Sequence, residues 1–297
     1  MRYWPLYVML LPCIVYYALI CYVPMAGSVL AFKDYSFKKG IWGSPWVGFD
    51  YFKTFFKSYD AGRLIRNTLA IGIIKCILEF PFAIILALLL NELRNMKFKK
   101  ISQTITYLPH FLSSVIIVTM LQKILAPNTG ILNQAIAALG GDGSTFFLMD
   151  AKYFYRILFS MDLWKNIGYG SVLYLSVLTG IDQEMYEAAD LDGANARQKM
   201  WYITLPMLIP MVVVMVLMGL GNIMHSDTGL FYQVTKNSGA LYSTTQVLDS
   251  YVFNAVMTAS NYSTTAATTL YQSVIGCVMM VATNLVVRKV APENALF

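Results

Sequence analysis

The sequence predicts an all-α membrane protein with six transmembrane helices. Of its 297 residues, 57% are hydrophobic and only 13% are charged, whereas an ordinary soluble domain carries about 25% charged residues. The mean hydropathy is +0.56, and several apolar runs reach the roughly 20 residues that a helix needs to cross a bilayer. Because backbone groups in lipid must be hydrogen-bonded within the segment, we expect these runs to be helical.

The apolar runs give the order of the spans along the chain. The predicted spans are Pro5–Ala31, Thr68–Leu90, Thr104–Leu125, Ile157–Gly180, Ile203–Met224 and Thr265–Val287. Pro12 and Pro24 predict kinks in the first span, since proline cannot donate a helical hydrogen bond. That span is too long and uninterrupted for a cleaved signal peptide, so we expect it to be retained. An even number of spans places both termini on one side of the membrane.

The distribution of basic residues does not decide which side that is. With the N-terminus inside, nine Lys and Arg residues lie on the inner side and eleven on the outer side, although cytoplasmic loops usually carry the excess. The short loop 91–103 favours this orientation because it concentrates Arg94, Lys97, Lys99 and Lys100.

A polar stretch, EAADLDGANARQKMWYITLP, separates the fourth and fifth predicted spans. Asp182–Leu191 is expected to form a helix, and Gly193 can adopt the left-handed conformation that ends one. A second short helix is expected over Ala194–Tyr202. Glu187 and Leu191 are four residues apart and therefore project from one face. This face is either a docking surface at the membrane boundary or part of a solvated loop.

The spacing in this stretch resembles the motif E-A-A-x3-G-x9-I-x-L-P of ABC importer permeases. The matching residues are Glu187, Ala188, Ala189, Gly193, Ile203, Leu205 and Pro206. Asp192 before the glycine resembles the carbohydrate branch of that family. Four further segments, Thr106–Ile116, Gly130–Ile136, Asp162–Asp182 and the terminal NLVVRK, resemble the subfamily that imports oligosaccharides or polysaccharide fragments.

The resemblance implies a type I ABC importer permease fold with both termini cytoplasmic, in a bacterial cytoplasmic membrane. It implies residues 1–66 as the first helix and a long extracytoplasmic loop, 67–289 as a five-helix core with coupling loop 181–206, and 290–297 as a cytoplasmic tail. The loop would contact a cytoplasmic ATPase through Glu187, Ala188, Ala189, Leu191, Asp192, Gly193 and Pro206. The implied partners are a second permease chain forming a heterodimer, two ATPase copies, an extracytoplasmic sugar-binding protein and membrane lipid.

Polar and aromatic residues within the outer halves of the spans are candidates for a sugar pathway, because polar groups are costly in lipid. They are Trp164, Lys165, Asn166 and Tyr169 in the fourth span, Asn222, His225 and Asp227 at the end of the fifth, and Tyr271 and Gln272 in the sixth. The alternative is that Trp164 and Tyr169 are interfacial anchors and that Lys165 reaches toward the interface.

Two further sites are either gates or structural features. Lys75 and Glu79 are four residues apart in the second span and can neutralise each other, either as a structural pair or as a gate. Pro109 and His110, followed by Ser113 and Ser114, predict a broken helix in the third span. That break is either a gate or a plain kink.

The sequence has few of the residues and motifs that several other functional classes require. It has no G-x-x-x-x-G-K-[ST] motif, so we expect no cofactor on this chain, with ATP and Mg²⁺ on the partner ATPase. The only histidines are His110 and His225, so we expect neither a metal site nor an enzyme. No basic stripe stands apart from the spans to predict nucleic-acid binding. The alternative functions are an ABC permease for a non-sugar solute and an ion-coupled secondary transporter.

Overall fold

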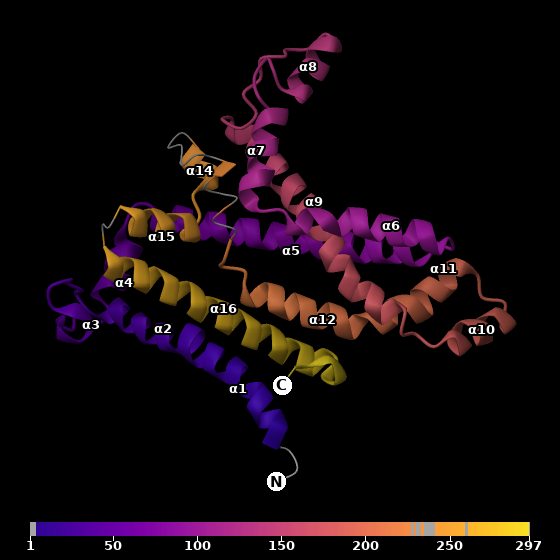
Figure 1. Ribbon diagram of the computed structural model, residues 1–297, viewed down its shortest axis with the longest axis horizontal. Coiled ribbons are helices and arrows are strands. Elements are labelled where there is room, and N and C mark those ends of the chain that lie inside the picture. Colours follow the sequence, from indigo (N-terminus) through magenta and orange to yellow (C-terminus); the bar gives the residue numbers. More distant parts are fainter. Residues whose placement is uncertain (1–3, 227–228, 230–232, 235–240, 259–260, 297) are drawn as a thin grey trace. The chain divides into compact units, whose positions relative to one another are not determined.

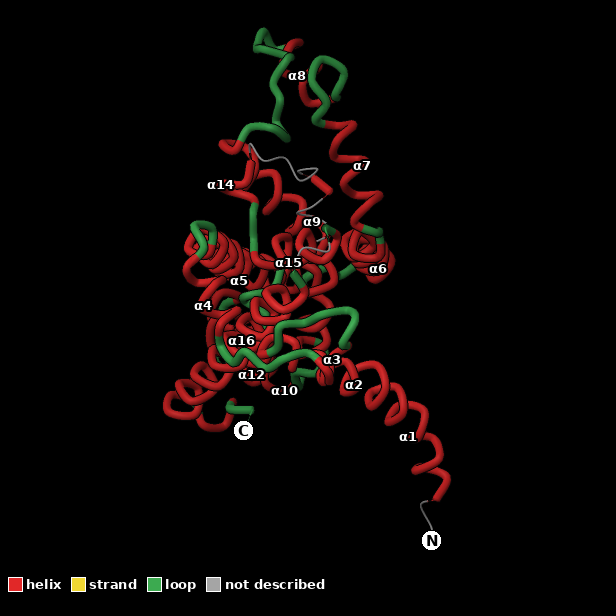
Figure 2. Tube along the Cα trace, turned by 90° about the vertical axis from the view of Figure 1, so that its left-hand side faces the viewer, coloured by secondary structure: helices red, strands yellow, loops and turns green. Residues whose placement is uncertain are grey.

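The computed structural model describes residues 4–226, 229, 233–234, 241–258 and 261–296. Among these residues the regular elements are helices, and the only β contact is a bridge between Lys33 and Trp46; Figure 2 shows this helical character along the chain. The fold divides into two compact units, Met1–Ile65 with Leu248–Val274, and Arg66–Val247 with Ile275–Phe297. The predicted all-α class is confirmed.

The first unit holds the first predicted span and most of the long loop that follows it. Its elements are α1 (Trp4–Tyr16), a π-helical turn (Tyr17–Tyr22), α2 (Val23–Met25), a 3-10 turn (Ala26–Phe32), α3 (Gly40–Gly43), α4 (Asp50–Lys57), α15 (Leu248–Met257) and the first part of α16 (Tyr262–Val290). The Ser263 hydroxyl donates to the Lys33 carbonyl at 2.6 Å and accepts from the Tyr35 amide at 3.1 Å. This hydroxyl ties the first loop to the start of α16.

The second unit contains the remaining long helices. Its elements are α5 (Ala61–Asn91, apart from its first turn), α6 (Met96–Tyr107), a 3-10 turn (Leu108–Phe111), α7 (Ser114–Ile124), α8 (Ile131–Ala138), α9 (Ala151–Leu178), α10 (Gln183–Leu191), α11 (Ala196–Lys199), a π-helical turn (Met200–Thr204), α12 (Leu205–Gly221), α14 (Tyr242–Thr245), the end of α16 and a 3-10 turn (Pro292–Asn294). α5, α9 and α12 share one buried apolar cluster that includes Ala87, Tyr174 and Leu208.

Four segments of the described chain are long and apolar enough to cross a membrane. They are Leu6–Phe32, Ala61–Asn91, Ala196–Gly221 and Tyr262–Val290, and the bent pair α6–α7 would make a fifth. α9, at the fourth predicted span, has 28 residues but is not among them. It carries Asp162, Lys165 and Asn166, which are polar enough to lower its apolar character. The count of six spans and the side of the termini stay predictions.

The predicted break in the third predicted span, Thr104–Leu125, is confirmed. α6 and α7 meet at an angle of 99°, a corner that is visible in Figure 1. Pro109 lies in the 3-10 turn that ends α6, and Leu112 is extended. Ser113 then caps α7, because its hydroxyl accepts the Ile116 amide at 3.4 Å. Proline ends one helix and serine starts the next in a new direction.

A glycine allows α9 to approach α6 closely. A Cβ atom on Gly168 would lie 2.0 Å from the carbonyl oxygen of Thr106, much closer than two such atoms can come. Gly170, two residues further on, has only the Ala83 methyl at 3.4 Å from its own Cβ position. The packing of α6 on α9 therefore depends on Gly168.

We expect Gly168→Ala to lower the free energy of unfolding by about 2 kcal/mol, because the added methyl group forces the two backbones apart. Gly170→Ala is the matched control, and should be neutral or slightly stabilising since alanine favours helix more than glycine does. Thermal unfolding of the detergent-solubilised variants measures both effects. Equal stability of the two variants would contradict the close contact.

Candidate functional site

A charged cluster joins α5 and α9 in the second unit. The Lys75 ammonium lies 3.1 Å from an Asp162 carboxylate oxygen and 4.0 Å from a Glu79 carboxylate oxygen. The Asp162 side chain is only 7% exposed, so its charge needs a partner. The predicted proximity of Lys75 and Glu79 is confirmed. The closer partner of Lys75 is Asp162, which was not among the predicted partners.

The corner before α7 and the polar residues of α9 meet this cluster. The Asn166 amide donates to Asp162 at 3.3 Å, and its carbonyl oxygen lies 3.1 Å from Nδ1 of His110. Because an amide oxygen only accepts, Nδ1 must carry the proton of this hydrogen bond. The His110 ring stacks on Tyr169 with centroids 4.1 Å apart and planes 5° apart. The predicted break and the polar positions of the fourth predicted span therefore form one site.

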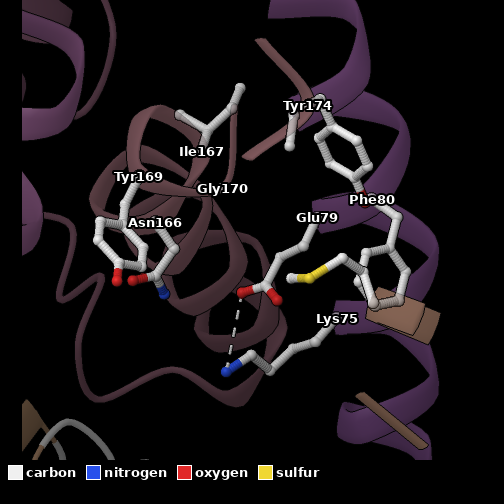
Figure 3. Close-up of a pocket in the computed structure, with 10 residues that line it drawn as sticks. Lys75, Glu79, Phe80, Asn166, Ile167, Tyr169, Gly170 and Tyr174 are labelled. Carbon is white, nitrogen blue, oxygen red and sulfur yellow. Dashed lines mark ion pairs between the residues drawn. The ribbon is translucent and has the colours of Figure 1, made fainter. Parts of the chain in front are cut away.

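Two adjoining cavities of about 280 Å³ each open beside this cluster. Both are lined by Lys75 and Glu79; Asn166 and Tyr169 line one, and Asn222 and His225 line the other. Figure 3 shows Asn166 and Tyr169 of α9 across from Glu79, with the Lys75–Glu79 ion pair dashed. Amide, carboxylate and ammonium groups beside an aromatic ring can bind a hydroxyl-rich solute.

The other predicted pathway residues lie elsewhere. Trp164 is exposed on α9 and Lys165 donates to the Ser114 hydroxyl at 3.3 Å. In the first unit, Gln272 is fully buried and donates to Asp249 at 2.9 Å, while the Tyr271 ring packs against Phe55 and Phe56. Asp227 lies outside the described residues. In this conformation Gln272 and Tyr271 join the helices of the first unit.

The polar stretch after α9 forms an exposed helix with a glycine stop, as predicted. The Asp182 side chain caps α10 by accepting from the Glu184 amide at 3.0 Å. Gly193 has φ +75°, and the amides of Ala194 and Gly193 donate to the carbonyls of Ala189 and Asp190. This pair of bonds closes the helix in the pattern that a left-handed glycine allows.

Contacts within the polar stretch hold its helices together, and side chains on its outer surface are exposed. Lys199 lies 2.6 Å from Asp190, and the hydroxyls of Tyr186 and Thr204 are 2.9 Å apart. The second predicted helix is shorter than Ala194–Tyr202, because α11 ends at Lys199 and a π-helical turn follows. Leu191 is 92% exposed and Glu187 is also exposed. An apolar side chain held in this way is suited to contact another surface.

Residues 79–292 match the family model described as "Binding-protein-dependent transport system inner membrane component". The chain belongs to this family. The match covers more than half of the chain and contains α10, Gly193 and most of the charged cluster. The predicted permease character and the absence of an enzymatic role are thus confirmed, because members of this family are membrane components of transport systems.

Similar proteins support this membership over almost the whole chain. Protein LplB of Bacillus subtilis (strain 168) is 38% identical over 97% of this chain and 90% of its own length. The polygalacturonan/rhamnogalacturonan transport system permease protein YteP of the same organism is 33% identical, with 97% and 89% covered. A chain of a bacterial alginate ABC transporter, crystallised with a periplasmic protein that holds an alginate pentasaccharide, has a TM-score of 0.87 and 32% identity over 97% of this permease and 96% of that chain.

Proposed function

We propose that this permease forms half of the translocation pathway of an ATP-driven oligosaccharide importer in a bacterial cytoplasmic membrane. The observation that carries the proposal is the exposed α10 with Leu191 and the glycine stop, in a chain of this family. The similar proteins named for polygalacturonan/rhamnogalacturonan and alginate transport support an oligosaccharide as the substrate.

The proposed assembly contains four kinds of protein. A second permease chain completes the pathway, two cytoplasmic ATPases hold ATP and Mg²⁺, and an extracytoplasmic protein delivers the sugar. α10 docks on one ATPase, so that closure of the ATPases on ATP moves α10 and the helices beyond it. With α10 on the cytoplasmic side, both termini of the permease also lie in the cytoplasm.

The sugar path runs beside the cluster of Lys75, Glu79 and Asn166 in this proposal. Carboxylate and amide groups exchange hydrogen bonds with sugar hydroxyls, and the Tyr169 ring offers an apolar face to a pyranose ring. The same groups are paired with each other in the structure, so sugar hydroxyls would replace existing partners. Such replacement favours weak binding and rapid passage.

Reconstitution tests this proposal. Proteoliposomes containing the permease, its second permease chain and the ATPase should accumulate oligosaccharide only with ATP inside and the binding protein outside. A panel of acidic and neutral oligosaccharides, an amino acid and phosphate would identify the solute class. Uptake of a non-sugar solute alone would contradict the sugar assignment, and uptake driven by an ion gradient without ATP would contradict the importer class.

A further inference from the structure

A basic cavity lies between the start of α6 and the end of α9. Its volume is about 550 Å³, larger than either cavity beside the charged cluster. The residues that line it are Met96, Lys97, Lys99, Lys100 and Gln103 from α6, with Leu175 and Thr179 from the end of α9. Among the described residues, three ammonium groups and no carboxylate line the cavity, so it is suited to attract an anion.

The position of these lysines on α6 strengthens that attraction. The first turn of a helix carries a partial positive charge and is stabilised by acidic side chains, yet α6 has no acid in its first turn. Within the described part of the chain no acidic side chain pairs with Lys97, Lys99 or Lys100. Uncompensated charge of one sign at a helix start predicts a bound anion.

The cavity begins close along the chain to the end of a segment that is able to cross a membrane. α5, one of the segments able to cross a membrane, ends at Asn91, only a few residues before Lys97. On the side of α6 away from the cavity, an exposed apolar stripe follows helical spacing through Phe98, Ile101 and Ile105. It continues to Leu108 in the turn after the helix. One face of α6 is therefore suited to acyl chains, while the other borders a basic cavity.

We propose that this cavity binds the headgroup of an anionic phospholipid. The phosphate oxygens would accept hydrogen bonds from the three ammonium groups and from the Gln103 amide. Met96 and Leu175 would cover the apolar start of the glycerol and acyl region. Basic cavities between helices at a membrane surface are suited to such headgroups. This lipid site is separate from the sugar path and does not depend on which solute is carried.

Binding of short-chain phosphatidylglycerol to the detergent-solubilised transporter containing the full chain tests the site. Calorimetry should show that Lys97→Gln, Lys99→Gln and Lys100→Gln together weaken binding by about 100-fold, since each basic group near such a lipid contributes roughly a fivefold factor. The matched control carries Lys38→Gln, Lys39→Gln and Lys57→Gln, which remove the same charge from exposed positions in the first unit, and should bind like the unmodified protein.

Three results would overturn the proposal. Equal weakening by the control would mean general charge attraction, and equal binding of short-chain phosphatidylcholine or inorganic phosphate would mean that the ligand is not an anionic lipid. If the variant with three glutamines no longer co-purified with the ATPase but still bound lipid, the lysines would contact the ATPase and not a lipid. Arginine at the same three positions should retain binding, which separates loss of charge from a folding defect.

Discussion

Replacing Lys75 with methionine is expected to lower the free energy of unfolding by about 3 kcal/mol, because removing one member of a buried ion pair leaves the other charge uncompensated. Asp162 is 7% exposed and 3.1 Å from the ammonium, whereas the Lys75 side chain is 24% exposed. The carboxylates of Asp162 and Glu79 would then face each other without the cation between them. Thermal and denaturant unfolding of the detergent-solubilised protein measures the loss.

Two further variants separate the effect of the ion pair on stability from the effect of packing. Combining Lys75→Met with Asp162→Leu should recover most of the lost stability, since an apolar pair can replace a buried ion pair at little cost. Glu79→Gln should cost less than Lys75→Met, because Glu79 is 4.0 Å from Lys75 and 31% exposed. If Glu79→Gln proved as destabilising as Lys75→Met, Glu79 rather than Asp162 would be the main partner.

The features that could be predicted from the sequence are those determined within one segment. Gly193 ends α10 in the left-handed conformation, and the Pro109–Ser114 stretch breaks a helix. Both follow from backbone preferences of a few neighbouring residues. The permease resemblance likewise depended on fixed spacing within a single polar stretch.

The features that were missed depend on contacts between segments. No local pattern could give the 99° angle between α6 and α7, because the packing of α6 on α9 through Gly168 helps to set it. Asp162 was missed for a similar reason. Its partner is 87 positions earlier in the sequence, although its four-residue spacing from Asn166 was a usable signal.

The charged cluster and α10 are joined by continuous structure in the second unit. α9 carries Asp162 and Asn166 and ends at Leu178, and α10 begins five residues later at Gln183. The buried cluster that includes Tyr174 and Leu208 also contains Ile181, with Tyr186 packed against it. A displacement of α10 would therefore act on the core that positions α9 and α12.

Substituting Gly193 with tryptophan is expected to reduce ATP-dependent uptake by about 100-fold, the upper part of the range for coupling between sites. The bulky side chain would project from the end of α10 and would obstruct an approaching ATPase, because no described residue other than the two chain neighbours has an atom within 4 Å of the Cβ position. Hydrolysis should continue without its dependence on the sugar-loaded binding protein, and Glu187→Arg should act in the same direction. Uptake and hydrolysis in proteoliposomes measure the two effects separately.

Gly140 provides the matched control for this substitution. It follows α8 with φ +83°, and apart from its chain neighbours no described residue has an atom within 4 Å of its Cβ position. It closes its helix with the same pair of backbone bonds. Tryptophan at either position must therefore adopt the left-handed conformation, at a similar cost of about 1 to 2 kcal/mol. Gly140→Trp should keep ATPase co-purification and coupled hydrolysis, whereas Gly193→Trp should lose the coupling. Normal uptake by Gly193→Trp would refute the docking role of α10, because strain alone is matched between the two variants.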